Sequence, residues 1–187
     1  SDHVEEFILD SCHANGYYIE DEVVSFTSEP KIWNYNRIDF KCKALEKAEY
    51  PAWEEFLERV DFPLIFMAWV GALLTPTDKI RQALILRGEG YDGKSVVIKA
   101  LQWILSGEKG STRGSVSVNE KMLEKSFIYS SVYGNHLVTL GDCKNPNFLE
   151  SEFIHSVTGG DAVPVEAKGV DSFTSHIYTK VIVATND

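Results

Sequence analysis

The sequence predicts an α/β fold in which a parallel sheet follows a small helical unit. The apolar segment QALIL, residues 82–86, leads into a glycine-rich loop, and residues with helical spacing follow that loop. Two later apolar runs, residues 136–142 and 178–186, each end in a polar residue. Strands of an open parallel sheet place such residues at the carboxyl edge, where ligands bind.

Composition and charge limit the possible classes of protein. The chain has 187 residues with 18 basic and 28 acidic side chains, giving a net charge of -10. This length suits one ordinary domain, or a core with a small appendage. The charge argues against a surface that is basic all over, but it allows a local basic patch.

The chain is expected to be cytoplasmic and without a membrane span. The longest apolar run, residues 64–74, is shorter than the roughly 20 residues that cross a bilayer, so it predicts a buried helix. The N-terminus carries acids where a secretory signal would carry basic residues. Cys12, Cys42 and Cys143 lack metal-binding spacing and predict free thiols in a reducing compartment.

The chain before the glycine loop is expected to form short strands and turns followed by two helices. Residues 16–40, rich in aromatic and β-branched side chains, predict short strands and turns. Pro51 starts an amphipathic helix, and residues 61–63 separate it from a second helix that ends before the TPTD turn. The apolar face of the first helix is formed by Trp53, Phe56, Leu57 and Val60. The expected units are a mixed N-terminal segment (1–48), a helical domain (49–78) and a core that contains the glycine loop (79–187).

The glycine loop predicts a nucleotide site. Gly88, Gly93, Lys94 and Ser95 match every fixed position of the P-loop pattern, with an apolar strand before and a helix after. Backbone N–H groups and the helix N-terminus would face phosphate oxygens, while Lys94 meets the outer phosphates and Ser95 holds Mg2+. A chance glycine turn with a solvated lysine is the alternative. The expected ATP-binding residues are Gly88, Glu89, Gly90, Tyr91, Asp92, Gly93, Lys94, Ser95 and Val96.

Two polar strand ends complete the expected catalytic set with Lys94. Asp142 follows the second apolar run, where P-loop enzymes place an acid that binds Mg2+ directly or through water. Its alternative role is to cap the turn into KNPN. Asn186 follows the third run, where its amide could orient the attacking water or contact the γ-phosphate. Considered alone, the residue is better explained as a turn asparagine.

The segment between these two runs predicts a β-hairpin. A Gly-Gly-Asp turn precedes alternating Val163, Val165 and Ala167, and then Lys168 and Gly169 form a basic tip. A lysine on a projecting hairpin can contact a nucleic-acid backbone. An ordinary exposed lysine is the equally open alternative.

These motifs resemble those of the superfamily 3 helicases of viruses and mobile elements, in particular the phage, plasmid and poxvirus primase-helicases. The similarity covers residues 51–186, in the family's order: PAWEEFLERV, GEGYDGKS, SVNEKMLEKSF, LVTLGD, IHSVTGGDAVPVEAKG and VIVATN. The resemblance implies an AAA+-type P-loop core behind a helical domain, assembled as a hexameric ring around single-stranded DNA and driven by ATP and Mg2+. Asp142 would be the acid of the second motif, Asn186 the polar sensor and Lys168 the DNA-binding residue of the channel hairpin.

Two departures from the family pattern modify this expectation. Many members have two adjacent acids in the second motif, whereas Asp142 lies between Gly141 and Cys143. The family's arginine finger follows the asparagine motif, beyond the last residue of this sequence. An arginine finger contributes about 10³ to 10⁵ in rate, so slow hydrolysis is expected from this chain alone. We therefore expect a part of a larger replication protein with an upstream primase or polymerase domain.

Two other functions compete with the helicase. A non-motor module would keep a nucleotide only to hold subunits together or to bind DNA. A P-loop small-molecule kinase would need an arginine-rich lid, which the sequence lacks, and would leave the TGGD hairpin without a role. The helicase interpretation is therefore preferred.

Overall fold

The fold is described from a computed structural model. It describes residues 51–74, 81–106, 110–111, 113–125, 127–141, 143, 146–167 and 170–186, and the backbone of residues 17–20 and 23–26. In this part of the chain no helix has the length and apolar character needed to cross a bilayer. Asp142 and Lys168 lie outside the described residues.

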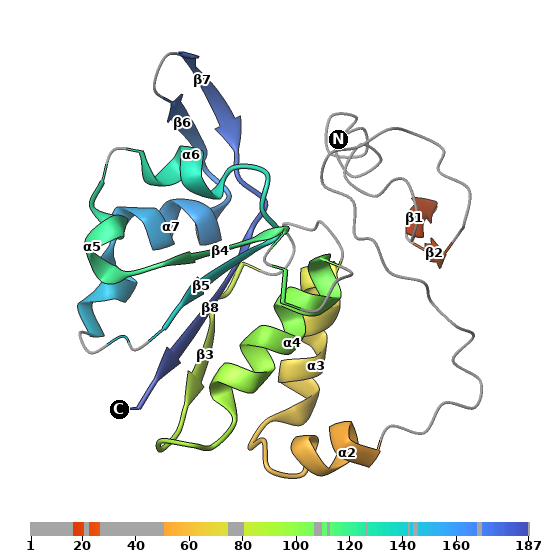
Figure 1. Cartoon of the computed structure of the whole chain (residues 1–187). Coiled ribbons are helices and arrows are strands. Elements are labelled where there is room, and N and C mark those ends of the chain that lie inside the picture. The colour runs from red at the N-terminus through yellow and green to blue at the C-terminus, as the bar shows by residue number, and fades with distance from the viewer. Residues whose placement is uncertain are drawn as a thin grey trace.

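A four-stranded parallel sheet forms the centre of the molecule (Figure 1). Its strands are β3 (Leu84–Arg87), β4 (Ser115–Val118), β5 (Leu137–Leu140) and β8 (Lys180–Thr185), in the spatial order β3-β8-β5-β4. The predicted α/β class with a parallel sheet is confirmed. Three of the four strands fall in the predicted apolar runs, whereas β4 was not predicted.

The two central strands, β5 and β8, are buried on both faces of the sheet, which explains why their sequences are continuous apolar runs. Side chains of β8 alternate between the faces of the sheet, so Val181 and Val183 join one buried cluster while Ile182 joins the other. In β5, Val138 and Leu140 face the first cluster and Leu137 faces the second. Strands covered on both faces need apolar side chains at every position.

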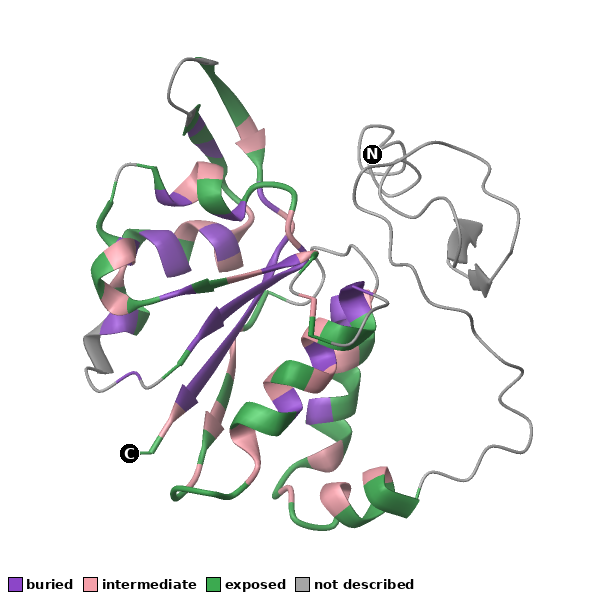
Figure 2. Ribbon diagram, in the orientation of Figure 1, coloured by how far each residue is buried: buried purple, intermediate pink, exposed green. Residues whose placement is uncertain are grey.

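Three helices cover one face of the sheet: α2 (Pro51–Leu57), α3 (Pro63–Leu74) and α4 (Lys94–Ser106). Val97, Leu101 and Leu105 of α4 lie one turn apart and are buried in the same cluster as Leu137 and Ile182. Figure 2 shows this buried stripe along α4. The aromatic rings of α2 and α3 pack beside it, with centroids 5.4–5.8 Å apart among Trp53, Phe56 and Phe66.

The second helix is amphipathic in its burial, which corrects the prediction of a buried helix over residues 64–74. Phe66, Trp69, Ala72 and Leu73 are buried, but Leu64 is 81% exposed and Ile65 is 65% exposed. A continuous apolar run is compatible with a helix that is buried on every side. In the described structure, however, α3 lies on the outer side of α4 and packs against other elements along one face only. The first helix also ends at Leu57, before the predicted Val60.

The other face of the sheet is covered by short helices, α5 (Glu120–Leu123), α6 (Ile128–Val132), the 3-10 helix η2 (Pro146–Glu150) and α7 (Glu152–Gly159). Ser151 caps α7, since its hydroxyl accepts from the N–H of Ile154 at 3.4 Å. Gly160, with φ 75°, ends α7 in the left-handed conformation that glycine adopts readily. The predicted Gly-Gly-Asp turn is therefore a helix cap.

The predicted β-hairpin is confirmed. Strands β6 (Ala162–Ala167) and β7 (Val170–His176) pair antiparallel and project beyond the sheet (Figure 1). A second antiparallel pair, β1 (Tyr17–Glu20) and β2 (Val23–Phe26), falls within the region predicted to hold short strands.

Candidate functional site

The glycine loop connects the carboxyl end of β3 to the first residue of α4. Gly93, with φ 98°, turns the chain into the helix, and its carbonyl accepts from the N–H groups of Val96 and Val97 at 2.9 and 3.0 Å. The loop residue Tyr91 also has a left-handed backbone, with φ 68°, and its side chain is fully exposed. The structure thus has the predicted order of strand, glycine loop and helix.

The ammonium of Lys94 lies inside the loop. Its Nζ donates to the carbonyls of Gly88 and Glu89 at 2.7 and 2.8 Å, and to both carboxylate oxygens of Asp92 at 2.9 and 2.8 Å. The lysine side chain is only 12% exposed. The lysine is therefore held by the loop and is not the solvated side chain of the alternative interpretation.

Asp92 is the anionic partner of this lysine. The hydrogen bond from the Lys94 side chain holds the pKa of the Asp92 carboxyl below its ordinary value, with partial burial acting in the opposite direction. Asp92 Oδ1 also accepts from the backbone N–H of Lys94 at 3.3 Å. The loop therefore already holds one anionic group against its cation.

Gly88 leaves room for this carboxylate. A Cβ added at Gly88 would lie 1.8 Å from Asp92 Oδ2, so a side chain there would displace the Asp92 carboxylate. The remaining predicted ATP-binding residues, Glu89, Gly90, Ser95 and Val96, are exposed at the same end of α4. A ligand in the loop can reach them from solvent.

Asn186 lies at the same edge of the sheet as the loop. In the parallel pair of β3 and β8, Arg87 is opposite Thr185, so Gly88 and Asn186 follow paired residues of neighbouring strands. The Thr185 hydroxyl donates to the Cys143 carbonyl at 3.0 Å, and the N–H of Cys143 donates to the Ala184 carbonyl at 3.3 Å. These bonds tie the end of β8 to the chain segment that follows β5.

The hairpin lies at the opposite edge of the sheet (Figure 1). Strand β7 ends at His176, and only residues 177–179 separate it from the amino end of β8. The hairpin base is tied to the end of α7, because His176 Nδ1 lies 3.0 Å from the Gly160 carbonyl. Arg81, which precedes β3, donates to the neighbouring Gly159 carbonyl at 3.0 Å. The TGGD segment therefore supports the hairpin and is remote from the glycine loop.

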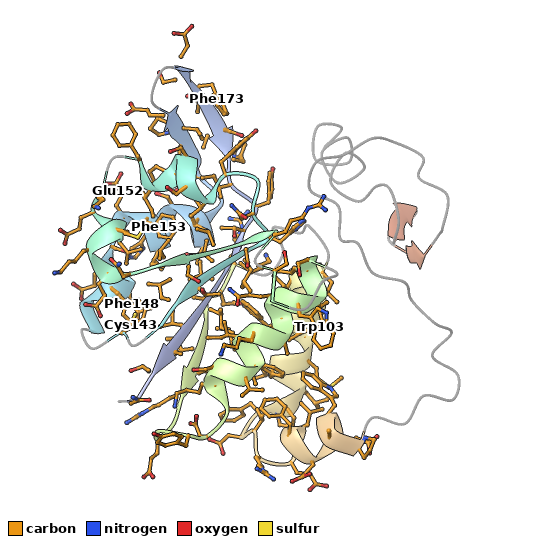
Figure 3. All side chains as sticks on the ribbon, viewed as in Figure 1. Trp103, Cys143, Phe148, Glu152, Phe153 and Phe173 are labelled. Carbon is orange, nitrogen blue, oxygen red and sulfur yellow. The ribbon has the colours of Figure 1, made fainter. Side chains whose placement is uncertain are left out.

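An aromatic pair joins the hairpin to α6. The rings of Tyr133 and Phe173 make an edge-to-face contact, with centroids 5.3 Å apart and an interplanar angle of 78°. Figure 3 shows Phe173 on the projecting strand β7. The contact restrains the direction in which the hairpin projects.

A cavity of about 640 Å³ opens elsewhere, among α5, α6, η2 and α7. Phe148, Glu152 and Phe153 line it, and Figure 3 shows them across the sheet from Trp103 of α4. None of the predicted site residues that the structure describes lines this cavity. The loop, where a cation, glycines and a helix N-terminus converge, is therefore the candidate site.

Sequence reasoning missed the ion pair between Asp92 and Lys94. Asp92 was expected in the loop only as one of the ATP-binding residues. The sequence did contain a signal for this ion pair, because the carboxylate of an acid two residues before a lysine in a glycine turn can reach the ammonium of that lysine. The hydrogen bonds of Cys143 with Ala184 and Thr185 were also missed, and no local sequence pattern predicts them.

Comparison with known proteins gives a family and a fold. The family model described as "family of unknown function (DUF5906)" matches residues 86–187, a little over half of the chain, and the chain belongs to this family. No curated protein matches it.

Solved structures of the NrS-1 C-terminal region are similar to this chain. An A-form apo structure has 16% identity and a TM-score of 0.60, and the match covers 92% of this chain and 40% of that one. An apo structure of residues 305–718 has 14% identity and a TM-score of 0.58, covering 93% and 41%. A further A-form apo structure has 12% identity, a TM-score of 0.59 and coverages of 93% and 40%. The chain thus shares a fold with about two-fifths of the NrS-1 region.

Proposed function

We propose that this member of the DUF5906 family binds ATP and Mg2+ in the loop of residues 88–95 and is the motor module of a larger DNA-replication protein. In this proposal it acts as a helicase that moves along single-stranded DNA. The observation that carries the proposal is the largely buried side chain of Lys94, whose ammonium is held inside a glycine loop at the N-terminus of α4.

The residues present suit a phosphate chain. The loop already accommodates the Asp92 carboxylate, so an anion fits against Lys94. The first N–H groups of a helix are free of intrahelical partners and favour negative charge. Lys94 would contact the outer phosphates, and Ser95, the second residue of α4, would hold Mg2+. The metal would neutralise charge on the phosphate oxygens.

The carboxyl edge of the sheet supports a hydrolytic role. Asn186 follows the residue paired with Arg87, so it lies one strand away from the start of the loop. We propose that the amide of Asn186 orients the attacking water. Asp142, which follows β5, is the proposed second ligand of Mg2+, as in other P-loop enzymes.

Strand β8 supports a link between nucleotide and DNA. Its carboxyl end carries Asn186, and its amino end continues from the hairpin through residues 177–179. Val181, Ile182 and Val183 are fully buried, so the strand is held rigidly along its length. In the proposal Lys168 on the hairpin contacts the DNA backbone, and movement at one end of β8 is transmitted to the other.

The proposed assembly is a homo-oligomeric ring, with six subunits in the family that the motifs resemble. A neighbouring subunit would supply the arginine that completes each ATP site. The upstream primase or polymerase domain would belong to the same longer polypeptide. The similarity to one part of the longer NrS-1 region supports a module of this kind.

The test is ATP turnover with and without single-stranded DNA over a range of protein concentrations. The chain is compared with a longer version that continues beyond Asp187, because that version would carry the arginine finger. Turnover that rises with DNA and steeply with concentration, chiefly in the longer chain, supports the motor. Turnover that is indifferent to DNA in both chains contradicts the motor and favours the non-motor nucleotide-binding module.

A further inference from the structure

We propose that Asp92 is a built-in competitor of phosphate, so that the loop selects diphosphate and triphosphate chains over a lone phosphate group or a carboxylate. This inference rests on the proposed function, because it assumes that the loop takes a phosphate chain. It assigns to Asp92 a role opposed to that of the loop residues around it.

The geometry shows a carboxylate already bound to the loop cation. Both oxygens of Asp92 accept from Lys94 Nζ, at 2.9 and 2.8 Å, and Oδ1 also accepts from the Lys94 backbone N–H at 3.3 Å. The carbonyls of Gly88 and Glu89 take the remaining hydrogen-bonding capacity of the ammonium. An incoming anion therefore has to displace an existing charged partner.

The backbone directs Asp92 into this place. Its neighbours Tyr91 and Gly93 both have positive φ, 68° and 98°, so the chain turns sharply on each side of Asp92. A left-handed conformation is unfavourable for tyrosine, whose side chain is fully exposed here. Asp92 Oδ2 lies over Gly88, where a Cβ would be only 1.8 Å away. The carboxylate thus covers the loop backbone that a phosphate would approach.

Displacement discriminates between anions by their charge. A carboxylate or a lone phosphate group meets Lys94 only at the place that the Asp92 carboxylate already occupies, so it gains little by exchange. A diphosphate or triphosphate carries more charge, and its further oxygens can reach N–H groups at the start of α4 while its first group replaces Asp92. The Asp92 side chain is 33% exposed, so it can swing into water when displaced.

The expected size of the effect follows from the exposure of the pair. The side chain of Asp92 is 33% exposed and that of Lys94 is 12% exposed, and an ion pair screened by solvent at the protein surface contributes at most about a fivefold change in an equilibrium constant. Removing the Asp92 charge should therefore tighten ATP binding by up to about fivefold. The affinity for a monophosphate should rise by a larger factor than the affinity for ATP, because the monophosphate competes with Asp92 for Lys94 alone.

The experiment compares the wild-type chain with Asp92→Asn and Asp92→Ala by titration calorimetry, using ATP and AMP as probes. Glu89→Gln removes the same formal charge from the loop without removing a carboxylate bound to Lys94, and so it measures the general gain from lower negative charge. Both Asp92 variants are expected to bind ATP more tightly than the wild type and than Glu89→Gln, with a smaller preference for ATP over AMP. ATP affinity in the Asp92 variants that is unchanged, weaker or equal to that of Glu89→Gln overturns the inference.

A Lys94→Ala variant separates this inference from the proposed function. Lys94-dependent ATP binding with no gain in the Asp92 variants would leave the proposed function standing and remove the competitor role of Asp92. Absence of ATP binding in the wild type and in every variant would overturn the proposed function, and this inference with it.

Discussion

Replacing Leu101 with alanine tests how α4 is held against the sheet, and therefore how Lys94 and Ser95 are positioned. Leu101 is 1% exposed and belongs to the buried cluster that contains Leu137 and Ile182. A buried leucine-to-alanine change costs about 2–5 kcal/mol, and the cost rises with the cavity that remains. Leu137 and Ile182 belong to hydrogen-bonded strands, so they cannot collapse into the space. We expect a loss of about 3 kcal/mol.

This loss is measurable by thermal unfolding followed by circular dichroism. For a chain of this size, about 1 kcal/mol shifts the melting temperature by about 2–4 °C, so a fall of about 6–12 °C is expected. Ile104→Ala on the same helix is the matched control, because Ile104 is 37% exposed and should cost less than about 1.5 kcal/mol. Equal melting temperatures for the two variants would refute the described packing of α4.

Three further predictions concern the hairpin, the sheet edge and the loop. Lys168→Ala should weaken binding of single-stranded DNA and flatten its dependence on salt while leaving ATP affinity unchanged; a wild-type salt slope would remove Lys168 from the DNA interface. Asn186→Ala should lower ATP turnover at least tenfold with little change in ATP affinity, measured by steady-state kinetics and calorimetry, because orienting the water matters only in the reaction. In an NMR titration the Asp92 carboxyl should have a pKa below its ordinary value of 3.8, and Lys94→Ala should raise that pKa towards 3.8. Because the folded-state pKa is lowered, the small stabilisation by this ion pair is present above pH 3.8 and is lost as the pH falls through the lowered pKa.

Much of the fold could be predicted because its central strands are simple apolar runs. Residues 82–86, 136–142 and 178–186 each contain a strand of the parallel sheet, and the glycine loop and the hairpin lie where their turn residues placed them. Strand β4 was missed because two of its four residues are serines. Ser115 is buried at the strand start, and the Ser117 hydroxyl lies 2.8 Å from that of Thr139, so tertiary contacts make this polar sequence a strand.

The surroundings of the helices and of the loop were harder to predict. The apolar run of α3 contains no periodicity to show that Leu64 and Ile65 are exposed while Phe66 and Trp69 are buried. That division depends on where α4 lies, which only the tertiary structure specifies. In the loop, the P-loop spacing predicted the position of Lys94, but its pairing with Asp92 depends on the left-handed conformation of Tyr91, for which the sequence has no glycine signal.

The central claim is that Lys94 binds the phosphates of ATP, and ATP binding to Lys94→Ala, measured by titration calorimetry, tests it most directly. Lys99→Ala is the matched control, since Lys99 is an exposed lysine on the same helix and its loss changes the net charge equally. The account predicts that Lys94→Ala loses ATP binding by at least about 100-fold while keeping the wild-type circular dichroism spectrum, and that Lys99→Ala binds ATP like the wild type. Equal ATP affinity in Lys94→Ala and the wild type would contradict the assignment of the loop as a nucleotide site.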